Sequence, residues 1–99
     1  MNADDIRRVL VIGSGTMGLQ IGLQAATHGF DVVLHDADPA ALDGAEQRLR
    51  GYGEAAVAAG SLNAYALDQA LARIEFISDP VAAAADADIV SESVRGSRA

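Results

Sequence analysis

Two short apolar runs, separated by a glycine-rich segment and a helical pattern, constrain the fold of this chain more than any other feature. The first run extends from Arg8 to Ile12, and the second, from Phe30 to His35, ends at Asp36. Continuous apolar runs of this length are typical of parallel strands that are covered on both faces. Because parallel neighbours need a crossover connection, the segment from Thr16 to His28 is predicted to be a helix, ended by Gly29.

The segment between the first strand and this helix is Gly13-Ser14-Gly15-Thr16-Met17-Gly18, which has the spacing G-x-G-x-x-G. This pattern is weak by itself, but here a strand precedes it, a helix follows it and an acid ends the next strand, which is the context of a dinucleotide-binding turn. Gly13 permits the tight turn, Gly15 lets the backbone approach a pyrophosphate, and Gly18 lets the helix pack closely on the strands. The free amides at the helix start would bind the pyrophosphate without a basic side chain.

Asp36 favours NAD over NADP, because its carboxylate would accept hydrogen bonds from the adenosine ribose and repel a 2′-phosphate. No arginine lies within ten residues after Asp36 to hold such a phosphate. Glu92, near the end of the last predicted strand, is a candidate for the nicotinamide side, with a solvated carboxylate as the alternative. A flavin site is disfavoured, because flavin sites more often place Glu at the position of Asp36. The predicted cofactor-binding residues are Gly13, Ser14, Gly15, Thr16, Met17, Gly18, Asp36 and Glu92.

Strands and helices continue to alternate in the rest of the chain. The sequence predicts a helix from Pro39 to about Ala59, a helix from about Ala64 to Ala72, a strand over 74–77, a short helix from Pro80 and a strand over 88–94. Gly51 predicts bending or fraying of the long helix, since Gly costs about 1 kcal/mol relative to Ala inside a helix. The fold class is therefore α/β, a Rossmann-like parallel sheet in the order 3-2-1-4 flanked by helices. We expect residues 1–99 to form a single, partial dinucleotide-binding domain.

Charge and composition exclude several classes of function. Fourteen acidic against seven basic residues give a net charge of −7, which disfavours nucleic acid and anionic membranes as partners. All basic residues are Arg and Cys is absent, which excludes a P-loop lysine, a Schiff base, a thiolate nucleophile and Cys-ligated zinc. No metal site and no catalytic residue is predicted: His28 is expected to interact with the carboxyl end of the first helix, and His35 to pack near the adenine end. The missing cysteines and the lack of a long apolar run favour a cytoplasmic protein.

Several segments together resemble the amino-terminal domain of the 3-hydroxyacyl-CoA dehydrogenase family. They are GSGTMG, the VVLHD strand that carries Asp36, the ARI before the third strand, and ADADIVSES, and the resemblance spans Arg8 to Val94. The 3-hydroxyisobutyrate and 6-phosphogluconate dehydrogenases have a similar turn but usually carry Asn-Arg where this chain has Asp36-Ala37. The resemblance implies NAD-linked oxidation of an L-3-hydroxyacyl thioester, or a related hydroxy acid, to the 3-keto product, with a place in fatty acid metabolism.

The resemblance also has a limit. The family's catalytic histidine and glutamate, and the Ser and Asn that position the substrate, belong to segments beyond residue 99. After Glu92-Ser93-Val94 the family commonly continues with Pro-Glu or a similar acidic pair, whose Glu lies near the cofactor, whereas this chain has Arg95-Gly96, so that contact is lost. The chain is therefore expected to be a truncated portion without the carboxyl-terminal catalytic and dimerisation parts, and inactive by itself.

Two expectations about partners follow. The chain should bind the small-molecule cofactor, with acyl-CoA as a substrate only in a full-length relative, and a non-enzymatic NAD(H)-responsive regulatory module is the alternative function. An unpaired apolar strand edge invites self-association, so we expect homo-oligomers through the fourth strand or its flanking helices.

Overall fold

The structure, a computed structural model, describes residues 7–92, and every predicted helix and strand is present within these limits. The predicted extension of the last strand to Val94, and Arg95-Gly96, lie outside the described residues. The elements in chain order are β1 (Arg8–Ile12), α1 (Thr16–Thr27), β2 (Asp31–His35), α2 (Pro39–Ala58), α3 (Ala64–Ala72), β3 (Ile74–Ile77), α4 (Pro80–Ala84) and β4 (Ile89–Glu92).

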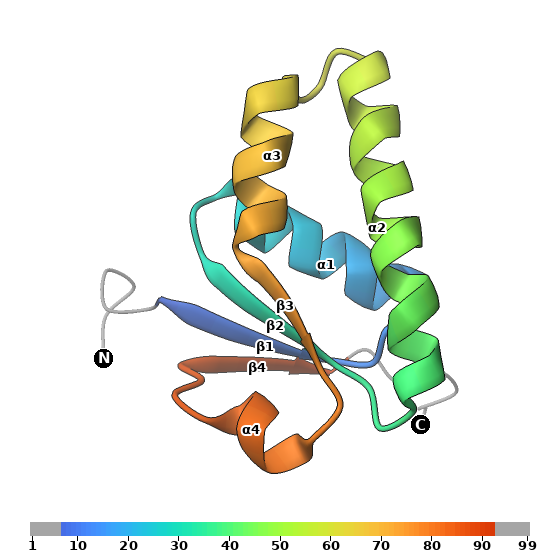
Figure 1. Ribbon diagram of the computed structural model, residues 1–99. Helices are drawn as coiled ribbons and strands as arrows, with labels where there is room; N and C mark the ends of the chain where they lie inside the picture. The colour runs from blue at the N-terminus through green and yellow to red at the C-terminus, as the bar shows by residue number, and fades with distance from the viewer. Residues whose placement is uncertain (1–6, 93–99) are drawn as a thin grey trace.

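The four strands form one parallel sheet in the order β3-β2-β1-β4, which confirms the predicted Rossmann-like topology. Helices α1, α2 and α3 lie on one face of this sheet, and α4 lies on the other (Figure 1). The chain changes face between β3 and β4, because right-handed crossovers from β1 to β2 to β3 run in one direction along the sheet and the crossover to β4 runs back. The result is a doubly wound arrangement.

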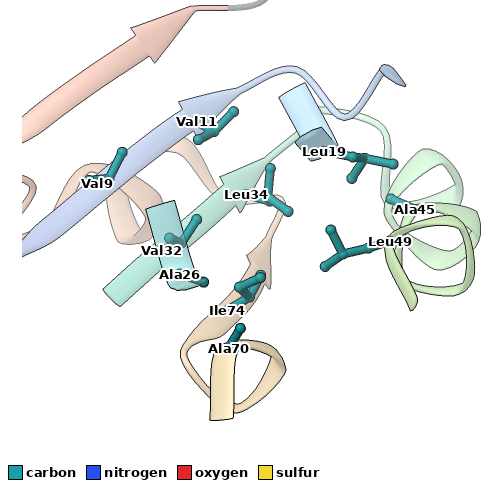
Figure 2. Close-up of a cluster of buried hydrophobic side chains, with 10 residues drawn as sticks. All are labelled: Val9, Val11, Leu19, Ala26, Val32, Leu34, Ala45, Leu49, Ala70 and Ile74. Carbon is teal, nitrogen blue, oxygen red and sulfur yellow. The ribbon is translucent and has the colours of Figure 1, made fainter. Parts of the chain in front are cut away.

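Alternate residues of the strands supply two hydrophobic cores of unequal size. The larger core lies between the sheet and helices α1, α2 and α3 (Figure 2), and it consists of Val9, Val11, Leu19, Ala26, Val32, Leu34, Ala45, Leu49, Ala70 and Ile74. The smaller core, under α4, has only Leu10, Val33 and Ala83 as fully buried members. Most of the apolar burial that holds the described residues together is therefore on the α1 to α3 face.

Helix α2 continues without a break through Gly51, so the fraying predicted there is wrong. Its buried residues are Leu42, Ala45, Leu49 and Gly53. Ala45 and Leu49 belong to the larger core, and Gly53 lies against Leu67 of α3. In proteins most helix stability comes from packing of one face, which here outweighs the low helix propensity of glycine.

Strand β4 is the less covered edge of the sheet. Within residues 7–92 it pairs only with β1, and Ile89 and Val90 are 42% and 55% exposed. The residue before β4, Asp88, links this strand to the start of β1: its Oδ2 accepts hydrogen bonds from the backbone N–H groups of Arg7 and Arg8 at 2.8 and 3.0 Å. These two hydrogen bonds hold the pKa of the Asp88 carboxyl below its ordinary value. Of the helices in the described region, none has the length and apolar character needed to span a membrane.

Candidate functional site

The glycine turn and Asp36 meet at the carboxyl edge of the sheet because β1 and β2 end in register. Ile12 pairs with His35, and Gly13, the residue after β1, donates its N–H to the His35 carbonyl at 2.8 Å. Gly13 has a φ of 101°, a backbone conformation that glycine adopts easily and that residues with a Cβ rarely adopt. Ile12 also pairs with Glu92 of β4, so this predicted residue belongs to the same edge, where it is exposed.

Gly18 brings α1 against the strands, as the motif predicts. It is buried, and a Cβ at this position would overlap the carbonyl oxygen of Gly13. Gly15 differs, because a Cβ there would have no neighbour within 4 Å. The turn is therefore tightly packed on its inner side and open above Gly15.

The start of α1 has no side-chain cap. Gly15 occupies the cap position with extended backbone, and neither it nor a neighbour supplies a side-chain acceptor for the first amides. The other three described helices are capped, by Asp38 in α2, Asn63 in α3 and Asp79 in α4. Gly15, Thr16 and Met17 are exposed, so the amides of the first turn of α1 are accessible to an anion.

The Asp36 carboxylate points at the glycine turn. Its Oδ2 accepts the Ser14 hydroxyl at 2.7 Å and the Ser14 N–H at 3.2 Å, and its Oδ1 accepts the Asp38 N–H at 3.0 Å. The Asp38 N–H and then the Ser14 hydroxyl hold the pKa of Asp36 below its ordinary value, against a small opposing effect of burial. Asp36 is therefore an anion at neutral pH, and it accepts the hydroxyl of Ser14, one of the predicted cofactor-binding residues.

Two residues of α2 reach the turn and were not predicted as site residues. Arg48 donates from Nη2 to the Ser14 carbonyl at 2.9 Å, and the Tyr52 hydroxyl donates to Thr16 Oγ1 at 3.4 Å. Tyr52 is partly buried and also packs against the larger core. The four-residue spacing of Arg48 and Tyr52 was visible in the sequence, but the side of α2 that faces the turn was not.

The two histidines occupy structural positions. His28 follows α1, with its Nδ1 at 2.8 Å from the Gln24 carbonyl, which agrees with its predicted place at the end of this helix. His35 Nδ1 lies 3.0 Å from the Ile77 carbonyl and links the ends of β2 and β3. In the part of the chain that the structure describes, no three His, Cys, Asp or Glu residues are grouped as a metal site.

Comparison with known proteins decides what this arrangement is. The sequence of residues 8–98 matches the protein-family model of the 3-hydroxyacyl-CoA dehydrogenase NAD-binding domain. The chain belongs to the 3-hydroxyacyl-CoA dehydrogenase family. It corresponds to the NAD-binding domain of that family, and NAD is its cofactor.

Three relatives of this family member have names that describe their activity. A 3-hydroxyadipyl-CoA dehydrogenase of Escherichia coli is 37% identical over 89 residues, which are 90% of this chain and 18% of the relative. The solved 3-hydroxybutyryl-CoA dehydrogenase of Escherichia coli is 36% identical with a TM-score of 0.83, over 94% of this chain and 20% of that one. A solved diketoreductase is 38% identical with a TM-score of 0.84, over 93% and 33%. The chain thus spans a fifth to a third of these relatives.

Proposed function

We propose that this chain binds NAD(H) at the glycine turn, as the cofactor-binding part of an oxidoreductase that interconverts 3-hydroxyacyl-CoA and 3-ketoacyl-CoA. The observation that carries the proposal is the Asp36 carboxylate, held toward a helix start whose amides have no side-chain cap. A bound NAD would accept or return the hydride of the hydroxyl-bearing carbon. The residues of this chain would supply binding and orientation.

Each predicted residue has a place in this proposal. The exposed amides of Thr16 and Met17, with that of Gly18, would receive the pyrophosphate, which approaches over the open side of Gly15. Asp36 would accept hydrogen bonds from the adenosine ribose. Glu92, at the end of the neighbouring strand, would lie toward the nicotinamide.

We also propose that the chain by itself does not turn over substrate. A general base must lie within hydrogen-bond reach of the substrate hydroxyl. The ring nitrogen Nδ1 of each histidine is engaged with a backbone carbonyl, and His28 lies at the far end of α1 from the glycine turn. Acetoacetyl-CoA with NADH should therefore give no loss of NADH absorbance above the protein-free rate, and a measurable, protein-dependent rate would contradict this part.

Binding is tested by titrating NADH fluorescence with the wild-type chain, Asp36→Ala and the matched control Asp31→Ala. Asp31 belongs to the same strand but lies at its exposed amino end. Asp36→Ala should weaken NADH binding at least tenfold, because it removes a charged acceptor of ribose hydroxyls that contributes about 1.5–3 kcal/mol. Asp31→Ala should change the affinity less than twofold. Undetectable NADH binding by the wild type, or equal losses in both variants, would contradict the proposal.

The remaining proposals concern partners and location. The exposed side chains of β4 and α4, among them Val81 at 78%, support self-association through this edge. The family match supports a role in fatty acid metabolism, for which we propose a cytoplasmic location. Sedimentation velocity should show dimers or larger species that increase with concentration. A single monomeric species at all concentrations would contradict self-association.

A further inference from the structure

Arg48 is the cation that the tertiary structure brings to the glycine turn. It lies twelve residues after Asp36 in sequence (48 − 36), yet its Nη2 donates to the carbonyl of Ser14 at 2.9 Å. Side chains on a helix tilt toward its amino end, and the amino end of α2 lies at the carboxyl edge of the sheet. The position of α2 is set by the buried Ala45 and Leu49, which belong to the larger core. Arg48 therefore reaches the turn from a rigid element.

Ser14 is held between two opposite charges. Its N–H and hydroxyl donate to Asp36, its carbonyl accepts from Arg48, and the residue is only 3% exposed. Among residues 7–92, Arg48 forms no ion pair with a carboxylate. The residue is exposed, and its guanidinium carries further N–H donors besides the one that contacts Ser14. An unpaired guanidinium of this kind can bind a phosphate through two parallel hydrogen bonds.

We infer that Arg48 is a specificity-determining residue, whose guanidinium lies beside the adenosine 2′ position and opposes Asp36 in the choice between NAD(H) and NADP(H). This inference rests on the proposed function, since it assumes that the ribose binds at Asp36. The Asp36 carboxylate accepts a 2′-hydroxyl and repels a 2′-phosphate, and Arg48 attracts that phosphate. Removal of the carboxylate should therefore uncover a site for NADPH that Arg48 supplies.

The test measures the dissociation constants of NADH and NADPH for the wild type, Asp36→Asn, Arg48→Gln and the double variant. Asn keeps the shape of Asp and an acceptor for the Ser14 hydroxyl. Asp36→Asn should bind NADPH about tenfold more tightly than the wild type does, because the repelling charge is gone. Adding Arg48→Gln should weaken NADPH binding about tenfold again, a clearly larger factor than its effect on NADH binding. Adding Arg48→Lys in place of Arg48→Gln should keep part of the NADPH affinity, since Lys retains the charge without the fork.

The matched control is Arg50→Gln in the Asp36→Asn background. Arg50 belongs to the same helix and carries the same charge, but it lines a separate cavity between α2 and β3 with Glu46 and Phe76. Its replacement should change NADPH binding less than twofold, and circular dichroism should show that every variant is folded. An equal effect of Arg50→Gln would overturn the inference, as would equal weakening of NADH and NADPH by Arg48→Gln, which is what a role confined to supporting the turn predicts. Undetectable NADH binding by the wild type would instead overturn the proposed function.

Discussion

Helices α1 and α2 both follow a strand at the same edge of the sheet and lie on the same face, but their amino ends are built differently (Figure 1). In α2 the Asp38 carboxylate accepts the Ala40 N–H at 3.0 Å and Pro39 occupies the first turn, so the chain caps this helix with its own residues. In α1 the cap residue is Gly15, which has no side chain to accept those amides. A helix start that lacks an internal cap is the one that suits an anionic ligand.

The two helices also differ in how they pack on the sheet. Helix α2 contacts the larger core through Ala45 and Leu49, whereas α1 lies against the strands through Gly18, Gly22 and Ala26, with Leu19 buried and Met17 65% exposed. Small residues let the axis of α1 approach the strands, which brings its first amides to the edge where Asp36 ends β2. The uncapped start of α1 and the small residues on its inner face therefore both suit the cofactor binding that we propose at this edge.

The largest predicted effect comes from converting the start of α1 into one like that of α2. Gly15→Asp fits the extended backbone and the open space at this position, and its carboxylate would accept the amides of the first turn. NADH affinity should fall roughly 100-fold or more, because the new carboxylate would occupy the place of the pyrophosphate and repel its negative charge. The free energy of unfolding should rise by a few tenths of a kcal/mol. NADH titration and thermal unfolding measure the two effects.

The control for this variant is Gly44→Asp, which adds the same charge at an exposed position of α2, where a Cβ would meet no neighbouring atom within 4 Å. It should leave NADH affinity within about twofold, since exposed charges at a distance are screened by salt. NADH binding that survives Gly15→Asp would show that the α1 start does not hold the pyrophosphate.

A smaller effect is expected from spoiling the close approach of α1. Gly18→Ala places a Cβ against the Gly13 carbonyl, so the turn or the helix must shift, which should lower the free energy of unfolding by about 2 kcal/mol. Gly51→Ala is the same chemical change at an exposed position of α2 with open space around it, and should raise stability by up to about 1 kcal/mol. Urea unfolding compares the two, and changes of the same sign would refute the packing argument.

The smallest predicted effect comes from removing the cap of α2. Asp38→Ala leaves the Ala40 N–H without its acceptor and should cost about 1 kcal/mol of stability, whereas Asp38→Asn should cost little, since Asn caps as well as Asp. NADH affinity should stay within about twofold in both, because the contact of residue 38 with Asp36 comes from its backbone N–H. A tenfold loss of affinity on Asp38→Ala would mean that the two helix starts are not independent.

Local patterns in the sequence were sufficient to predict the strands, the helices and the glycine turn. Periodicity, turn residues and helix-start residues act over a few neighbours, so β1, the Gly13 turn and the start of α2 at Pro39 could be predicted directly. The parallel order of the strands followed from the right hand of the crossovers. The resemblance to the family was likewise carried by contiguous segments such as GSGTMG, and the comparison confirmed it.

Only the tertiary structure showed how residues distant in sequence meet. The contact of Arg48 with Ser14 joins residues 34 apart, and it depends on how α2 sits against α1 and the sheet. That placement results from the summed packing of a core drawn from all parts of the fold, which no local spacing encodes. For the same reason, only packing showed that Leu19 is buried and that its neighbour in the same helix, Met17, is exposed. The sequence by itself determined the elements and the place of Asp36 directly after β2, whereas packing decided that Arg48 lies beside the glycine turn.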